Sequence, residues 1–387
     1  MPQPFAYLPW PTWLPLAALL VQLYYAARYF WPLATRPPEA AFEAPGPAAA
    51  PLSVLVCAHN ELENLRELLP LLLQQEHAAP LEIVLIDDRS RDDTYLFAQQ
   101  LAQYYPARFR LVTVAHTPAG FAPKKYALTL GIKAARHEQL LFTDADCRPA
   151  SPHWATLMQR GFAGAVPAAA SPLKIVLGAS FPVPGPGFLN RLVRYETLLT
   201  AAQYLGFAGR GRPYMGVGRN LAYTRATFRA TKGFARHIRH LSGDDDLLVQ
   251  DAVQHGATAA VVADPPAQTT TQAPATWAAW WRQKRRHLSA GTRYRPADRA
   301  RIGIFLAANG LFYLGTGAGA WFPQAWVSLG LIWAVRTILT TTVFHQVARR
   351  LGQPLPLLWV PLLDVAYFTQ YLFLGLSLSI NRRLRWK

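Results

Sequence analysis

The chain has 387 residues, of which 51% are hydrophobic and only 16% are charged, so it is more apolar than soluble enzymes usually are. Its net charge is +17, and the only carboxylates after Asp264 are Asp298 and Asp364, so the positive excess lies in the apolar C-terminal third. This distribution suits anionic lipid headgroups, and no DNA- or RNA-binding motif is present, which argues against a nucleic-acid-binding protein. Cys57 and Cys147 lack the spacing of a redox or zinc site.

The N-terminal end is expected to form a membrane anchor. The stretch Trp10–Ala27 is nearly all apolar, just long enough to span a bilayer, and is followed by Arg28 and Arg36. No Lys or Arg precedes it, so it lacks the charged start of a secretory signal peptide. Basic residues on its C-terminal side favour a cytoplasmic location for that side. We therefore expect an anchor over residues 1–36 and a Pro- and Ala-rich linker over residues 37–51.

Strands and helices alternate in the part of the chain that follows. Short apolar runs predict strands over Leu52–Ala58, Leu81–Ile86, Phe109–Val114 and Gln139–Phe142, and helical patterns follow the first three, through Leu65–Leu72, Asp93–Tyr105 and Lys124–Arg136. This alternation predicts an α/β fold with a mostly parallel sheet covered on both faces. Ligands bind such sheets at the carboxyl ends of the strands, where the polar motifs of this sequence fall.

Two further segments join this predicted domain to the C-terminal region. Phe188–Phe207 is expected to be a helix, either interfacial on a membrane or covering the sheet. Trp277–Arg301 is aromatic and basic, as is typical of a membrane–water boundary. We place the catalytic domain over residues 52–290 and a membrane region over residues 291–387.

The membrane region contains three apolar segments, which are Ile302–Phe322, Ala325–Phe344 and Leu355–Ile380. With the catalytic domain in the cytoplasm, three full crossings would leave the basic C-terminus outside, against the positive-inside rule. Either one segment is re-entrant or interfacial, which leaves two full crossings, or the rule fails and all three cross; we favour the first. Arg336 and Asp364 lie within these segments, where lone charges are costly, and we expect them to pair across helices.

Polar side chains follow the first two predicted strands. Asn60 and Glu61 follow the first, and they are suited either to bind a base or ribose or to form an ordinary loop with a helix cap. The second strand runs into paired carboxylates, of which Asp88 is expected to contact a nucleotide. Of the next carboxylates, Asp92 or Asp93 is expected to cap the following helix.

The fourth predicted strand ends in Asp144-Ala145-Asp146. Residues two apart in an extended chain point the same way, so Asp144 and Asp146 can converge on one cation. Carboxylate oxygens are hard ligands, suited to Mg²⁺ or Mn²⁺. The alternative is a solvated acidic turn, because this short pattern also occurs by chance.

A third acidic cluster, Asp244–Asp246, follows Ser242. Ser242 is expected to cap a helix, with the carboxylates favoured by its positive N-terminus. The carboxylates are also expected to raise one another's pKa, which suits a general base. Further on, the run Gln283–His287 follows three tryptophans, and its cations either hold a pyrophosphate or form a basic patch that faces lipid.

Taken in order, these motifs resemble those of family-2 glycosyltransferases, inverting enzymes with a Rossmann-like GT-A domain. The resemblance covers roughly residues 52–288. The matching positions are Ala58, Asn60 and Glu61, then Asp87, Asp88 and Ser90, then Lys124, Ala127 and Leu128, then Asp144 and Asp146, then Gly216–Tyr223, Asp244 and Asp245, and finally Gln283 and Arg286.

The resemblance implies a role for several of these residues. Asp88 would contact the nucleotide, Lys124 would approach it, and Asp245 would be the catalytic base. The cation would be Mg²⁺ or Mn²⁺, and the donor a nucleotide sugar, which we expect to be UDP-linked. Gln283 and Arg286 match the family's Q-x-x-R-W motif, but His287 replaces its Trp, which counts against a polymerising activity.

We therefore expect an integral protein of the plasma (inner) membrane with a cytoplasmic catalytic domain. It would transfer a sugar to a hydroxyl group of a lipid or saccharide acceptor while in contact with membrane lipids. Two alternatives stay open, which are a processive polysaccharide synthase and a catalytically silent membrane scaffold.

Overall fold

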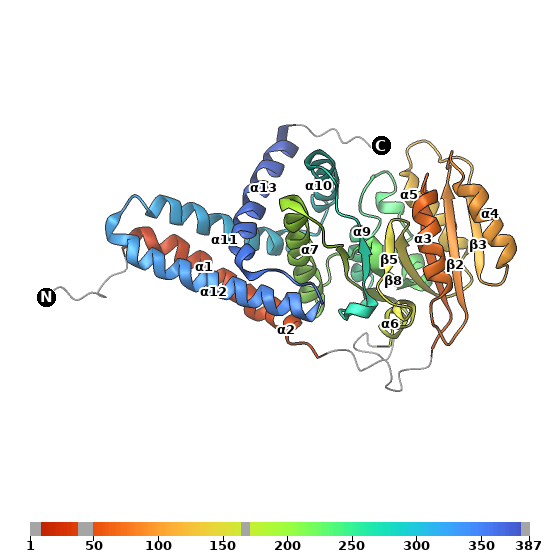
Figure 1. Ribbon diagram of the computed structural model, residues 1–387, viewed down its shortest axis with the longest axis horizontal. Coiled ribbons are helices and arrows are strands. Elements are labelled where there is room, and N and C mark those ends of the chain that lie inside the picture. Colours follow the sequence, from red (N-terminus) through yellow and green to blue (C-terminus); the bar gives the residue numbers. More distant parts are fainter. Residues whose placement is uncertain (1–8, 38–48, 164–170, 381–387) are drawn as a thin grey trace. The chain divides into compact units, whose positions relative to one another are not determined.

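The computed structural model describes residues 9–37, 49–163 and 171–380. These residues form two compact units, one containing 9–36, 198–206 and 295–380 and the other containing 49–163, 171–197 and 207–294. Figure 1 labels many of the elements of each unit. Most of the expected linker over residues 37–51, and the basic C-terminus used in the topology argument, lie outside the described residues.

A seven-stranded sheet forms the core of the second unit. Its strands, in spatial order, are β3 (Phe109–Val114), β2 (Leu81–Asp88), β1 (Leu52–Ala58), β4 (Gln139–Asp144), β8 (Leu221–Thr224), β6 (Lys174–Leu177) and β9 (Thr258–Val261). The first four are parallel to one another, β8 is antiparallel to both neighbours, and β6 and β9 are parallel. The expected α/β fold with a mostly parallel sheet is thus confirmed.

Helices cover both faces of this sheet. Leu65 of α3 (Leu62–Leu73) packs in one apolar cluster with Val54 and Leu85. Gly131 of α5 (Pro123–Ala134) lies against Ile86 on the other face, so closely that an added Cβ would be 2.5 Å from its side chain. Because neighbouring strand residues point to opposite faces, Leu85 and Ile86 place α3 and α5 on opposite sides.

The remaining elements of this unit surround the sheet. The helices are α4 (Thr94–Tyr104), α6 (Trp154–Arg160), α8 (Arg225–Ala230), α9 (Asp246–Gln254) and α10 (Trp277–Gly291), with short 3₁₀ turns η3 (Gly218–Asn220), η4 (Ala235–His237) and η5 (Pro265–Ala267). A three-stranded sheet contains β5 (Cys147–Pro149), β10 (Thr269–Thr271) and β7 (Ser180–Pro182). Helix α7 (Gly187–Ala208) belongs partly to each unit.

The first unit is helical. It contains η1 (Trp10–Thr12), α1 (Trp13–Tyr25), the π-helical turn η2 (Ala26–Phe30), α2 (Trp31–Ala34), α11 (Pro296–Gly319), η6 (Pro323–Ala325), α12 (Trp326–Arg350), η7 (Leu357–Trp359) and α13 (Val360–Ile380). Among the described residues, two helical stretches, Pro296–Gly319 and Pro323–Arg350, are long and apolar enough to cross a membrane. Length and composition alone are weak evidence for a membrane span, because core helices of soluble proteins meet the same criterion.

A buried polar network joins α12 and α13. The guanidinium of Arg336 pairs with Asp364 at 2.7 Å, which confirms the expected ion pair. It also donates to the side chains of Gln22 at 2.8 Å, Asn309 at 2.9 Å and Tyr313 at 3.0 Å. Arg336 and Asp364 are each 3% exposed, so the partners provide the compensation that a buried ion pair needs.

Helix α7 is largely enclosed by protein. None of its residues from Leu192 to Ala208 is exposed, and Gly206 lies against the backbone of Tyr29. A helix lying on a membrane surface keeps one apolar face outside the protein, so this burial counts against the interfacial alternative for Phe188–Phe207.

Candidate active site

The register of the sheet brings the predicted strand-end motifs to one edge. Asp144, at the end of β4, is paired with Cys57 of β1, and Ala58 of β1 is paired with Asp87 of β2. The residues that follow β1, β2 and β4 therefore emerge side by side. A small pocket at this edge is lined, among others, by Cys57, Lys124, Asp144 and Asp245.

The loops after β1 and β2 are hydrogen-bonded together. Asn60 accepts from the backbone N–H of Arg91 at 2.7 Å, and its own N–H donates to the Ser90 hydroxyl at 3.0 Å. Arg89 donates to the buried carboxylate of Asp88 at 2.7 Å. Asn60 and Arg89 both have positive φ, of 55° and 60°, a conformation that non-glycine residues adopt at some energetic cost and often at functional sites.

Asp92 stabilises the starts of two helices, as the capping interpretation predicts. Its carboxylate accepts from the backbone N–H of Thr94 at 3.1 Å, in α4, and of Leu62 at 3.4 Å, in α3. Partial burial would raise the pKa of Asp92, but these hydrogen bonds outweigh it and the pKa lies below its usual value. Asp93 occupies the N-cap position of α4 without a side-chain capping bond.

Glu61 faces the carboxylates at the end of β4. It accepts a hydrogen bond from Asn64 at 2.6 Å. Burial raises the pKa of Glu61, and the negative charges of Asp146 and Asp144 add to this effect. The charges of both members of the D-x-D motif, Asp144 and Asp146, therefore act on Glu61.

Lys124 connects two motifs that are far apart in the sequence. Its ammonium group lies 2.9 Å from Asp144 Oδ1 and 3.1 Å from Asp244 Oδ2. Burial alone would lower the pKa of Lys124, but the two carboxylates outweigh this effect and hold it well above its usual value. Lys124 is therefore a permanent cation between the strand-end motif and the acidic loop Ser242–Asp246.

The acidic loop is fixed by backbone N–H groups that donate hydrogen bonds to the carboxylate of Asp245. Asp245 Oδ2 accepts from the backbone N–H of Gly218 at 2.8 Å, and Oδ1 accepts from the N–H of Asp246 at 2.8 Å. Asp245 is the N-cap of α9, so the expectation that Ser242 caps this helix is wrong. Since the first turn of α9 starts only at Asp246, Ser242 lies too far from it to cap. Asp246 accepts a hydrogen bond from the hydroxyl of Tyr294.

The three neighbouring carboxylates have different electrostatic environments. Burial and the negative charge of Asp244 raise the pKa of Asp245, and burial and the charge of Asp245 hold that of Asp246 well above its usual value. Burial acts in the same direction on Asp244, but its ion pair with Lys124 lowers the pKa below the usual value. The expected mutual increase therefore holds for two of the three and is wrong for Asp244.

Asp144 and Asp146 offer two carboxylates to a cation. Asp144 is half-buried and Asp146 is exposed, and Asp146 also accepts from the hydroxyl of Thr271 at 3.3 Å. Within the described ranges, no group of three or more His, Cys, Asp or Glu side chains is arranged to hold a metal. Two carboxylates are nevertheless a fitting donor set for Mg²⁺ or Mn²⁺ where substrate phosphates and water complete the coordination.

Gln283 and Arg286 lie one turn apart on α10. Between them, Lys284 pairs with the buried Glu196 at 2.8 Å. His287, which replaces the family's Trp, is exposed on the same helix.

Sequence reasoning missed two buried polar residues that shape the site. Lys125 bonds the loop before the acidic motif, as described below. Asn220 accepts from the Trp154 indole N–H at 3.0 Å and donates to the carbonyls of Ala179 and Ala267, each at 2.8 Å. Asn220 falls inside the matched segment Gly216–Tyr223, which was the available signal, whereas Lys125 matches no motif and carries no signal of its own.

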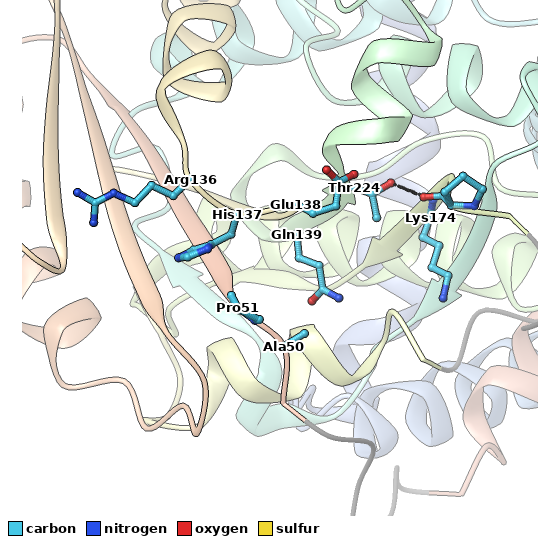
Figure 2. Close-up of a pocket in the computed structure, with 9 residues that line it drawn as sticks. Ala50, Pro51, Arg136, His137, Glu138, Gln139, Lys174 and Thr224 are labelled. Atoms are coloured by element: carbon cyan, nitrogen blue, oxygen red, sulfur yellow. Dashed lines mark hydrogen bonds between the residues drawn. The ribbon is translucent and has the colours of Figure 1, made fainter.

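A larger cavity of about 440 Å³ lies at the opposite edge of the sheet. Figure 2 shows its lining residues, which include Pro51 and Gln139 at the amino ends of β1 and β4. Its polar groups bond locally, as where Thr224 donates to the Pro172 carbonyl at 2.7 Å and Glu138 accepts from the N–H of Ala226 at 2.7 Å. The convergent carboxylates lie at the other edge, which is therefore the candidate active site.

Two family models match this chain. A model described as "Glycosyl transferase family 2" matches residues 53–169, and one described as "Glycosyl transferase family group 2" matches residues 156–376, more than half of the chain. The chain belongs to glycosyltransferase family 2. This membership confirms the resemblance stated from the motifs.

Individual glycosyltransferases are more distant. The probable glycosyltransferase YdaM of Bacillus subtilis is 25% identical over 243 residues, which cover 61% of this chain and 54% of YdaM, so the chain spans about half the length of this relative. The mannosyltransferase PcManGT from Pyrobaculum calidifontis, solved with GDP-Man and Mn²⁺, aligns with 88% of this chain and 96% of its own at a TM-score of 0.52 and 20% identity. That likeness shows a shared fold. TarS of S. aureus, solved with UDP-GlcNAc, aligns with 83% of this chain and 90% of its own at a TM-score of 0.40 and 16% identity.

Proposed function

We propose that this protein is a membrane-bound inverting glycosyltransferase that moves a sugar from a nucleotide-sugar donor to a hydroxyl acceptor. The observation that carries the proposal is the ion-pair network of Lys124, which joins Asp144 at the sheet edge to Asp244 in the acidic loop. A donor subsite and a base subsite within one network are what a single displacement needs, because both substrates must be aligned at once.

The donor's nucleotide would bind at the ends of β1 and β2, near Asn60, Glu61 and Asp88. We propose a UDP-linked sugar. PcManGT, which shares the fold, was solved with GDP-Man, so GDP-linked donors belong in any test. Asp88 would accept from the base or ribose after exchanging its contact with Arg89.

Asp144 and Asp146 would hold Mg²⁺ or Mn²⁺ at the donor diphosphate. The ion supplies positive charge that neutralises the diphosphate as a leaving group. Lys124 would add a second positive charge on the same side, and Arg286, with Gln283, would approach the diphosphate from α10.

Asp245 would act as the general base. It takes the proton of the acceptor hydroxyl while the hydroxyl oxygen forms a bond to the anomeric carbon. The bond from that carbon to the diphosphate oxygen breaks, and the nucleoside diphosphate leaves with the electron pair. Burial and the charge of Asp244 raise the pKa of Asp245, which makes it a better proton acceptor than an ordinary aspartate.

We propose that α11 and α12 anchor the enzyme in the plasma membrane with its catalytic unit in the cytoplasm, and that the acceptor is a lipid. The two apolar helical stretches and the basic residues that precede α11 support this placement. The acceptor could instead be a saccharide. The alternative functions are processive polysaccharide synthesis and that of a catalytically silent scaffold. Long products would indicate the processive enzyme.

The test is nucleotide release by the full-length protein in detergent, with Mn²⁺ or Mg²⁺, lipid acceptors and a panel of UDP- and GDP-linked sugars. We expect release from one donor, loss of release on adding a chelator, and the same loss in Asp146→Ala. Glu63→Ala is the matched control, because Glu63 is an exposed carboxylate whose ion pair with Arg66 lies at the surface of α3. If the wild-type protein released no nucleotide from any donor of the panel, the catalytically silent scaffold would be favoured.

A further inference from the structure

Lys125 is a buried cation without a role in the function proposed above. It follows Lys124 in the first turn of α5, yet it is 1% exposed. An ammonium group buried in this way is costly unless it is hydrogen-bonded. Its partners therefore show which part of the structure depends on it.

The described partners of the Lys125 ammonium group all lie in the segment that leads to the acidic motif. Its Nζ donates to the carbonyl oxygen of His237 at 2.9 Å and to that of Ser242 at 2.8 Å, and lies 3.0 Å from His237 Nδ1. These three contacts match the three N–H donors of an ammonium group. A backbone bond of 2.8 Å from Ala122 to Ile238 attaches the same segment to the start of α5.

The ring of His237 faces Asp251 of α9 on its other side. Its Nε2 lies 3.5 Å from Asp251 Oδ2, and Asp251 Oδ1 accepts from Arg236 at 2.8 Å. If Nδ1 accepts from Lys125, Nε2 carries the proton and points to the carboxylate. The segment is thus bonded to α5 on one side and to α9 on the other.

Consecutive residues of α5 therefore hold the acidic loop in different ways. Lys124 pairs with the Asp244 carboxylate at 3.1 Å, and Lys125 bonds the backbone of Ser242, two residues earlier. We infer that Lys125 is a positioning residue that fixes the acidic loop, and with it Asp245, relative to the donor subsite. This inference rests on the proposed function, because it assigns to Lys125 the placement of the proposed base.

The charge state of Lys125 suits this role. Burial lowers its pKa to about 8, against the opposing effect of Asp244 and Asp245. The group is therefore mainly an ammonium ion at pH 7 and can donate all three hydrogen bonds.

The test compares Lys125→Met with the wild-type protein, full length and in detergent. Methionine has a similar length and no donor. We measure kcat with the donor that the wild type accepts, and the dissociation constants of UDP and GDP by calorimetry with Mn²⁺ present. We expect kcat per nucleotide-binding site to fall by about 100-fold, the effect of a misplacement of about 1 Å, with nucleotide affinity unchanged. Hydrogen exchange of the amides of residues 238–246 should become faster.

Glu82→Gln is the control for lost stability alone. Glu82 is 1% exposed and bonds Ser53 and Arg110, away from the acidic loop, so its substitution should lower Tm without lowering kcat per binding site. If Lys125→Met does not fold, Lys125→Gln keeps amide donors on a shorter chain and should lower kcat in the same direction.

A wild-type kcat in either Lys125 variant, or loss of nucleotide binding together with turnover, would overturn the inference. If the wild-type protein releases no nucleotide from any donor, the proposed function fails instead. The exchange rates of residues 238–246 then decide the positioning role, because they do not depend on activity. Unchanged rates would reject it.

Discussion

Lys124 and Asp144 form an ion pair across the edge of the sheet, with 2.9 Å between Nζ and Oδ1. The lysine is in the first turn of α5 and the aspartate at the end of β4. Because Lys124 also contacts Asp244, this pair places the strand-end motif within reach of the acidic loop. Neither motif reveals this proximity when it is considered alone.

Replacing Lys124 by Met should weaken binding of a nucleoside diphosphate by about 10- to 100-fold, because a charge-assisted hydrogen bond contributes about 1.5–3 kcal/mol. Calorimetric titration with UDP and with GDP measures this. Lys133→Met is the matched control, since Lys133 lies on the same helix and is exposed. Equal nucleotide affinities in the two variants would show that Lys124 does not contribute to the donor subsite.

The pH dependence of kcat should report the acidic loop. A general base works when deprotonated, so activity is lost as the pH falls through its pKa. Burial and the charge of Asp244 raise the pKa of Asp245, so the acid limb should lie above the pH at which an ordinary aspartate titrates.

Asp244→Asn provides the test of that cause. It removes the negative charge and frees the Lys124 ammonium, and both changes lower the pKa of Asp245. The acid limb of the kcat profile should therefore move to lower pH. Movement in the opposite direction, or none, would show that another group controls the limb.

The parallel half of the fold could be predicted from the sequence because its signals are local. The strands β1 and β3 have the predicted bounds, since each is an apolar run that ends in polar or turn residues. The other half of the sheet is made of strands of four residues, such as β8, whose apolar pattern is too short to distinguish from a loop. Its antiparallel pairing with β4 depends on contacts distant in the chain.

The candidate site was predictable in its residues but not in their pairing. Asp244 and Asp245 are adjacent, yet their pKa values move in opposite directions because Lys124 contacts Asp244. The spacing to Ala127 and Leu128 singles out Lys124, but only the folded segment from His237 to Ser242 shows that Lys125 is a buried donor.

Replacing one member of the buried pair Arg336–Asp364 should lower the stability of the protein more than replacing both. Arg336→Met or Asp364→Leu alone leaves an uncompensated buried charge, which destabilises by about 3–5 kcal/mol. The double variant should recover much of the lost stability. Thermal unfolding in detergent measures all three, and a double variant less stable than either single variant would contradict this explanation.

The most direct test of the account is Asp245→Asn, measured for both sugar transfer and nucleotide binding. General bases contribute about 10²- to 10⁴-fold to rates, so transfer should fall by that order while the dissociation constant for the nucleotide stays near that of the wild type. Glu138→Gln is the control, because Glu138 is an exposed carboxylate at the opposite edge of the sheet, where it accepts from the N–H of Ala226. Transfer at the wild-type rate, or loss of nucleotide binding together with transfer, would contradict the assignment of Asp245 as the base.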